Sequence, residues 1–134
     1  MPCREEETSV FWIETDQELA DAVASWENCV GLDTEFIRAD TFYPIPGLYQ
    51  VASADQVFLI DPLTIEDWQP FRRFLMNPTT LIVMHACQED LEMLNHHLKV
   101  QPASVFDTQF AHAFTGVDYS LSYANLVRGT IGVE

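Results

Sequence analysis

The sequence predicts a single α/β domain, in which three antiparallel strands and then parallel strands form a mixed sheet with flanking helices. Short extended runs separated by turn residues occupy the first half of the chain, and a continuous apolar run leads directly into a helix in the second half. A strand that passes through a helix into another strand requires a parallel neighbour. The chain is 48% hydrophobic, which is enough apolar material for one core. Its length of 134 residues is too short for two ordinary domains.

The first half of the chain is expected to hold one helix and three extended segments. Thr15 and Glu18 have the spacing of a capping box, which predicts a helix from about residue 16 to about residue 28. Three runs of apolar and alternating residues follow, separated by turn residues, and this pattern predicts an antiparallel meander. The three runs span residues 31–36, 48–53 and 57–61.

The second half is expected to alternate helices with strands. Thr64 and Asp67 can cap a helix that ends before Pro78. The apolar run at 80–84 predicts a strand buried on both faces, and it leads into a helix at 88–98. A short strand at 105–106 and helices at 107–114 and 121–127 complete the expected elements.

The chain is strongly acidic. Its 21 acidic and six basic residues give a formal charge of −15, so bulk electrostatics cannot hold a polyanion. A nucleic-acid partner would need bound divalent metal, a local basic patch, or a basic domain outside this chain. Only the first of these leaves a trace in the sequence.

Composition also indicates a compartment. No apolar run approaches the roughly 18 residues of a membrane span, and the acidic start lacks the pattern of a signal peptide, so we expect no membrane partner and a cytoplasmic location. The three cysteines lack C-x-x-C spacing. We therefore expect reduced thiols, two of them buried, rather than a disulfide framework or a zinc site.

Asp33 and Glu35 are the strongest local chemical signal. At i and i+2 of an extended segment they share one face, and burying two like charges together is costly unless a cation neutralises them. Asp90 lies early in the helix after the buried strand, so its carboxylate can approach this pair. The pattern favours a metal site, with solvent-facing acids as the alternative.

Five strings occur in order along the chain: Asp33-Thr34-Glu35-Phe36, Gly47-Leu48-Tyr49-Gln50, Leu59-Ile60-Asp61-Pro62-Leu63, His85-Ala86-Cys87-Gln88-Glu89-Asp90-Leu91-Glu92 and Phe106-Asp107-Thr108-Gln109. In this order and at similar separations, they closely resemble ribonuclease D. The resemblance covers about residues 10 to 134. It implies a member of the DEDD superfamily of 3′–5′ exonucleases, with a ribonuclease H-like fold, two divalent metals, and single-stranded RNA 3′ ends, including those of tRNA precursors, as substrate.

The resemblance implies roles for particular residues. Asp33, Glu35 and Asp90 match the first and second exonuclease motifs, which makes them catalytic ligands of Mg²⁺ or Mn²⁺. Phe36 would bind substrate by packing against the terminal nucleotide, with core packing as the alternative. His85 would contact substrate or satisfy a hydrogen bond of its turn.

Three further polar positions carry weaker expectations. Asp107 is expected to cap the following helix or to support the site from behind. Arg38 could meet a phosphate. His96 and His97 are expected on the solvent face of their helix.

The third motif of ribonuclease D, a Tyr four residues before an Asp, is absent from these 134 residues. We therefore expect residues 1–134 to form a C-terminally truncated exonuclease domain with impaired activity. An uncovered sheet face is expected to drive homo-oligomer formation. Two alternatives stay open: a non-catalytic nucleic-acid-binding module with the same fold, and an acidic oligomerisation module.

Overall fold

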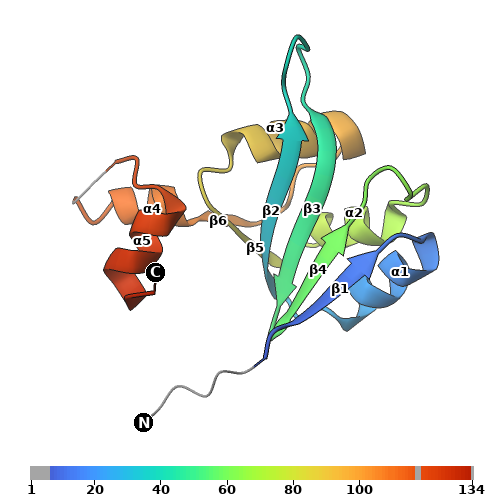
Figure 1. Ribbon diagram of the computed structural model, residues 1–134, viewed down its shortest axis with the longest axis horizontal. Helices are drawn as coiled ribbons and strands as arrows, with labels where there is room; N and C mark the ends of the chain where they lie inside the picture. Colours follow the sequence, from blue (N-terminus) through green and yellow to red (C-terminus); the bar gives the residue numbers. More distant parts are fainter. Residues whose placement is uncertain (1–6, 117–118, 134) are drawn as a thin grey trace.

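A six-stranded mixed sheet forms the centre of the computed structural model, which describes residues 7–116 and 119–133 (Figure 1). The strand order across the sheet is β1-β4-β3-β2-β5-β6. The strands are β1 (Ser9–Ile13), β2 (Cys29–Ile37), β3 (Ile45–Ser53), β4 (Gln56–Ile60), β5 (Leu81–Met84) and β6 (Val105–Asp107). The helices are α1 (Asp16–Ser25), α2 (Gln69–Met76), α3 (Gln88–Leu98), α4 (Thr108–Ala113) and α5 (Tyr123–Ile131).

The strand directions confirm the predicted topology. β2, β3 and β4 pair antiparallel in chain order, and β5 and β6 continue the sheet in parallel beyond β2. β1 is an additional strand that the sequence analysis did not anticipate, and it pairs in parallel with β4. The meander therefore lies between two parallel regions.

The core lies between the sheet and α1, α2 and α3. Along β2, Val30, Leu32 and Thr34 are buried, whereas Asp33 and Glu35 are exposed. This alternation is what an extended strand with one covered face requires. All three helices contribute to the core cluster: Leu19 and Ala22 from α1, Phe71 and Leu75 from α2, and Met93, Leu94 and Leu98 from α3.

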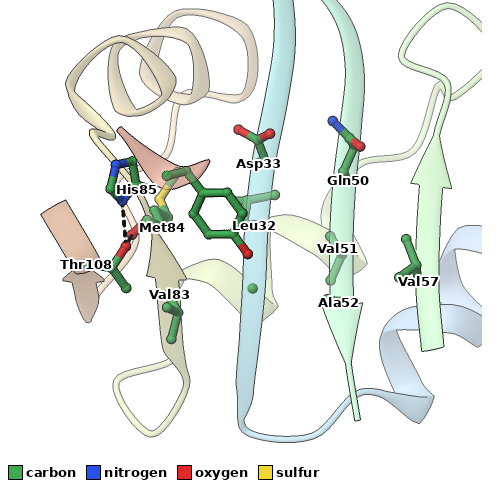
Figure 2. A pocket seen from close by; sticks show the side chains of 12 residues that line it. Leu32, Asp33, Gln50, Val51, Ala52, Val57, Val83, Met84, His85 and Thr108 are labelled. Carbon is green, nitrogen blue, oxygen red and sulfur yellow. Dashed lines mark hydrogen bonds between the residues drawn. The ribbon is translucent and has the colours of Figure 1, made fainter. Parts of the chain in front are cut away.

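The opposite face of the sheet is open and apolar. Gly31 and Ala52 are small, and a side chain at Gly31 would only reach ordinary contact with the Ala52 Cβ atom, at 3.6 Å. A cavity of about 410 Å³ lies over this part of the face (Figure 2). The strand register places one residue of each strand in a continuous row across this face: Val10, Val57, Ala52, Gly31, Val83 and Phe106.

The open face corrects the prediction that β5 is buried on both sides. Ile82 and Met84 are buried against the helices, but Leu81 on the open face is 38% exposed. The apolar run predicted two covered faces because hydrophobic composition records an affinity for burial and not the presence of a covering element.

The helix boundaries contain one confirmed and one wrong cap. Thr15 and Glu18 form the predicted capping box of α1, although the helix ends at Ser25, earlier than expected. Thr64 does not cap α2, which begins at Gln69; the Thr64 hydroxyl instead donates to the Asp61 carbonyl oxygen. The Asp67 carboxylate, the other predicted cap, accepts from the backbone N–H of Gln69 at 3.0 Å. Thr64, which its spacing placed at the start of a helix, therefore stabilises the turn between β4 and α2.

The exposure of the thiols differs from the sequence prediction. Cys87 is buried, but Cys29 is exposed, so the expectation of two buried thiols is not met among the described residues, and Cys3 lies outside them. No helix in the part of the chain that the structure describes is long and apolar enough to span a bilayer.

Candidate functional site

β2 presents two carboxylates on the open side of the sheet. Asp33 lies opposite Gln50 on β3, and Glu35 lies opposite Leu48. The Gln50 Nε2 atom is 3.5 Å from the Glu35 Oε1 atom. Figure 2 shows the Asp33 and Gln50 side chains on neighbouring strands beside the cavity. The predicted acidic pair is thus exposed on one face, with an amide beside it.

A β-bulge lies beside Glu35, with Gly47 of β3 as the extra residue, and the alternation along β2 continues through it to Phe36. The register between β2 and β3 shifts between Glu35 and Phe36. Gly47 lies opposite, where an added Cβ atom would come within 3.3 Å of the Glu35 carbonyl oxygen, so glycine allows the close approach of the two backbones. Phe36 is partly buried and packs against the core. Its core-packing role is observed, and its contact with a nucleotide stays a prediction.

Asp90 reaches this region from the first turn of α3. It is buried, at 8% exposure, and its Oδ1 atom accepts a hydrogen bond from the Thr34 hydroxyl on β2. Burial raises the pKa of Asp90, the Thr34 hydrogen bond opposes this, and the Asp33 charge raises the pKa further. Asp33 and Asp90 are therefore close enough to influence each other electrostatically.

The three carboxylates are of the right chemical type to bind a metal ion, but they are not gathered into a cluster. Oxygen ligands of this kind are those that Mg²⁺ and Mn²⁺ prefer. Among the described residues, however, no three His, Cys, Asp or Glu side chains are grouped closely enough to hold a metal ion. Thr34 also engages one of the two oxygens of Asp90. The donor set fits a divalent cation, and the structure shows its members as neighbours rather than as an assembled cluster.

Asp107 holds the turn that precedes Asp90. Its Oδ1 atom accepts hydrogen bonds from the backbone N–H groups of Gln109 and Phe110 at 2.9 and 3.2 Å, which confirms the predicted cap of α4. The same carboxylate accepts from the backbone N–H groups of Ala86 and Cys87, each at 3.0 Å. Burial alone would raise the pKa of Asp107, but these hydrogen bonds outweigh it and lower the pKa.

His85 is engaged within the chain through both ring nitrogens. Nδ1 lies 2.8 Å from the Thr108 hydroxyl (Figure 2). Nε2 donates to the Leu121 carbonyl oxygen at 2.8 Å. Gln109 donates to the same carbonyl at 3.2 Å, and the Tyr123 ring packs edge-on against the imidazole. The predicted hydrogen bond within its own turn is therefore not what the ring makes: both bonds go to later segments of the chain, and substrate contact by His85 stays a prediction.

The other cationic candidates contact protein groups. Arg38 forms ion pairs with Glu92 at 2.8 Å and with Glu89 at 3.5 Å. His96 stacks on Tyr43, with 3.9 Å between ring centroids, and the Nδ1 atom of His97 lies 2.6 Å from the Tyr49 hydroxyl. The expectation that both histidines face solvent was wrong because the β2–β3 hairpin and β3 pack against this helix.

Two residues at the site were missed. Thr34 lies between the paired acids, so strand alternation already turns it toward α3, and that signal was available in the sequence. Gln50 is brought beside Glu35 by the register of β2 and β3, which the bulge determines. No spacing in the sequence reveals this contact.

Comparison with known proteins identifies the family of this chain. A family model described as 3′–5′ exonuclease matches residues 10–134. The ribonuclease D proteins of Pseudomonas paraeruginosa and Escherichia coli strain K12 are 42% and 39% identical, over 93% and 90% of this chain. The chain spans about a third of the length of these curated relatives, 34% and 33%.

Solved structures agree with the fold. The crystal structure of Escherichia coli ribonuclease D, an exoribonuclease involved in structured RNA processing, superposes with a TM-score of 0.84 at 38% identity, covering 91% of this chain and 33% of that one. Trypanosoma brucei ribonuclease D in complex with RNA U12 gives a TM-score of 0.84 at 24% identity, covering 95% and 48%. The family match over most of the chain, together with these relatives, shows that this chain belongs to the 3′–5′ exonuclease family of which ribonuclease D is a member.

Proposed function

We propose that the chain carries a Mg²⁺- or Mn²⁺-dependent exonuclease site at Asp33, Glu35 and Asp90. The supporting observation is that Asp90, delivered by α3, hydrogen-bonds the residue between the two exposed acids of β2. When bound, divalent metals supply an activated water and stabilise the leaving oxygen of a phosphodiester. The contribution of the chain is to place three oxygen ligands on rigid elements.

The substrate we propose is the 3′ end of single-stranded RNA, including tRNA-type ends. One relative is described as acting in structured RNA processing, and one structural neighbour is described in complex with RNA. With a formal charge of −15, the chain needs metal or base contacts to hold RNA. We also propose the cytoplasm as its location and Phe36 as a contact of the terminal nucleotide.

Metal binding tests the ligand set directly. Millimolar Mn²⁺ should raise the melting temperature of the chain, because a ligand that binds only the folded state stabilises it. Asp33→Asn should remove that rise, whereas Asp55→Asn, at an exposed acid in the β3–β4 turn, should keep it. An equal rise in the Asp33 variant would place the metal elsewhere.

Activity tests the rest of the proposal. These 134 residues contain no Tyr-x-x-x-Asp. We therefore propose that they trim a 5′-labelled single-stranded RNA very slowly with Mn²⁺, and that a longer chain with such a segment trims faster. Asp33→Asn should abolish trimming in both. Rapid Mn²⁺-dependent trimming by the short chain, lost in Asp33→Asn, would show that three carboxylates suffice.

A non-catalytic RNA-binding module is the second candidate. It is favoured by the Thr34 bond to Asp90 and by the lack of an assembled three-ligand group among the described residues. In that case RNA would bind equally well with and without Mn²⁺, and the longer chain would release no nucleotides. Exonuclease activity in the longer chain would exclude this candidate.

A further inference from the structure

The tip of the β2–β3 hairpin carries exposed aromatic rings. Phe42 is 81% exposed and packs edge-on against Tyr43, with 4.9 Å between ring centroids. Tyr43 in turn stacks flat on His96 of α3, at 3.9 Å and an interplanar angle of 4°. We call these three residues the aromatic tip. The outermost ring of the aromatic tip, Phe42, is exposed to solvent. Burying this ring against a ligand would be favourable.

The aromatic tip is held in place. Arg38, at the start of the hairpin loop, forms ion pairs with Glu89 and Glu92 on α3. The Tyr43–His96 stack fixes the other side of the loop to the same helix. Figure 1 shows the hairpin rising past α3 at the top of the molecule. These two contacts with α3 hold the rings in place before a ligand binds. Less conformational entropy is therefore lost when a ligand stacks on them.

The aromatic tip is continuous with the proposed site. The last cross-strand pair of the hairpin joins Ile37 to Ile45, and Ile37 lies two residues beyond Glu35. Phe42 lies seven residues beyond Glu35, which is at most about 25 Å along an extended chain. A strand of RNA whose end reaches Asp33 and Glu35 and follows the hairpin can therefore meet the tip several nucleotides upstream.

Charge selects the part of RNA that this surface can bind. The chain is strongly acidic, and the nearby Arg38 is already paired with two glutamates, so phosphates are not attracted here. Aromatic faces bind nucleobases through stacking, which tolerates any sequence and needs no positive charge. The tip fits bases rather than the backbone.

We propose that the aromatic tip is a second RNA contact, on which a base upstream of the 3′ end stacks against Phe42. This inference rests on the proposed RNA substrate and adds a binding position that the three carboxylates do not provide. Phe42 is a binding residue and takes no part in the cleavage chemistry.

Binding without metal tests the inference apart from catalysis. A 5′-fluorescein oligouridine is titrated with the chain in EDTA at low salt, and anisotropy gives the dissociation constant. Phe42→Ala should weaken binding about tenfold, the change expected for one lost base–aromatic stack. Phe42→Trp should keep or strengthen it. Phe114→Ala is the matched control, because Phe114 is likewise 80% exposed and packs edge-on against a second aromatic ring, Phe110.

An abasic oligonucleotide of the same length separates stacking from backbone contact. Wild type and Phe42→Ala should bind it equally. Three results would overturn the inference. Wild type and Phe42→Ala could bind oligouridine with equal affinity, or Phe42→Ala could lose as much affinity for the abasic strand as for oligouridine. The third is that the wild type shows no measurable binding to oligouridine. Failure of the exonuclease proposal is visible separately, as an absence of Mn²⁺-dependent trimming by the longer chain with a Tyr-x-x-x-Asp segment, while the Phe42 difference in binding persists.

Discussion

Asp107 shows how one side chain can serve two segments of backbone. Its carboxylate accepts four backbone N–H groups, two in the turn before α3 and two at the start of α4. The sequence predicted the cap of α4 because the capping residue and the amides are neighbours. It could not predict the bonds to Ala86 and Cys87, which lie about 20 residues away in the chain.

Replacing Asp107 should destabilise the fold in a pH-dependent way. Asp107→Asn keeps one acceptor oxygen and loses the other, which should cost about 1–3 kcal/mol at pH 7. The folded pKa is below the ordinary value of 3.8, so this stabilisation is complete above pH 3.8 and is lost as pH falls through the folded pKa. Urea unfolding of wild type and Asp107→Asn at neutral pH and below pH 3.8 measures the loss of stability and its dependence on pH. A difference between wild type and variant that does not change with pH would contradict the ionised carboxylate as the cause.

The site residues differ in how far the sequence could place them. Asp33 and Glu35 share the exposed face that alternation predicts, and Asp90 lies near Asp33, as the strand-to-helix connection implied. The Thr34 hydrogen bond was open to the same reasoning. Gln50 was not, because the bulge after Glu35 determines which residue of β3 lies beside it.

At the scale of elements, α3 is joined to β3 by a half-buried hydrogen bond. The Tyr49 hydroxyl lies 2.6 Å from the Nδ1 atom of His97, and Trp68 packs edge-on against the same imidazole. Burial lowers the pKa of His97 below the usual 6.5, and the neighbouring His96 lowers it further. Acid therefore acts against the packing of this helix on the sheet.

The His97 contact predicts a loss of stability in mild acid. The unfolded state takes up the proton near pH 6.5 and the folded state only at lower pH, so the contribution is complete above pH 6.5 and declines as pH falls below it. His97→Gln keeps an acceptor for Tyr49 but does not titrate. Urea midpoints across this window should fall less in His97→Gln than in wild type. His112→Gln is the control, and an identical decline in all three proteins would refute the assignment.

Helices and strands were predictable where the pattern is local. α3 runs from Gln88 to Leu98, as the sequence predicts, and the capping box begins α1. β1 was missed because a short apolar run beside an acidic start becomes a strand only through parallel pairing with β4, a contact distant in the chain. Thr64 was misassigned because the same Ser/Thr chemistry serves turns and helix caps.

At the scale of the whole molecule, the open face of the sheet exposes apolar side chains to solvent. Val10 and Trp12 at its edge are 55% and 61% exposed, and Val57 and Val83 line the cavity nearer the centre. Apolar patches of this kind commonly mark interaction sites. The row across six strands makes this face a candidate for self-association.

We expect self-association to be measurable. Sedimentation velocity at high micromolar concentration should show a dimer or larger species, because pairing two open faces removes apolar surface from water. Trp12→Glu should shift the chain toward monomer by placing a charge in the interface. A clean monomer for the wild type at high micromolar concentration would contradict this expectation.

The bonds of Asp107 also have a consequence for hydrogen exchange. The amides of Ala86, Cys87, Gln109 and Phe110 share one acceptor group, so opening the first turn of α4 removes protection at both segments together. The four amides should then exchange with deuterium as one unit, although two precede α3 and two follow β6. A loosening of the chain near residue 107 would reach the start of the helix that carries Asp90 without any change in Asp90 itself.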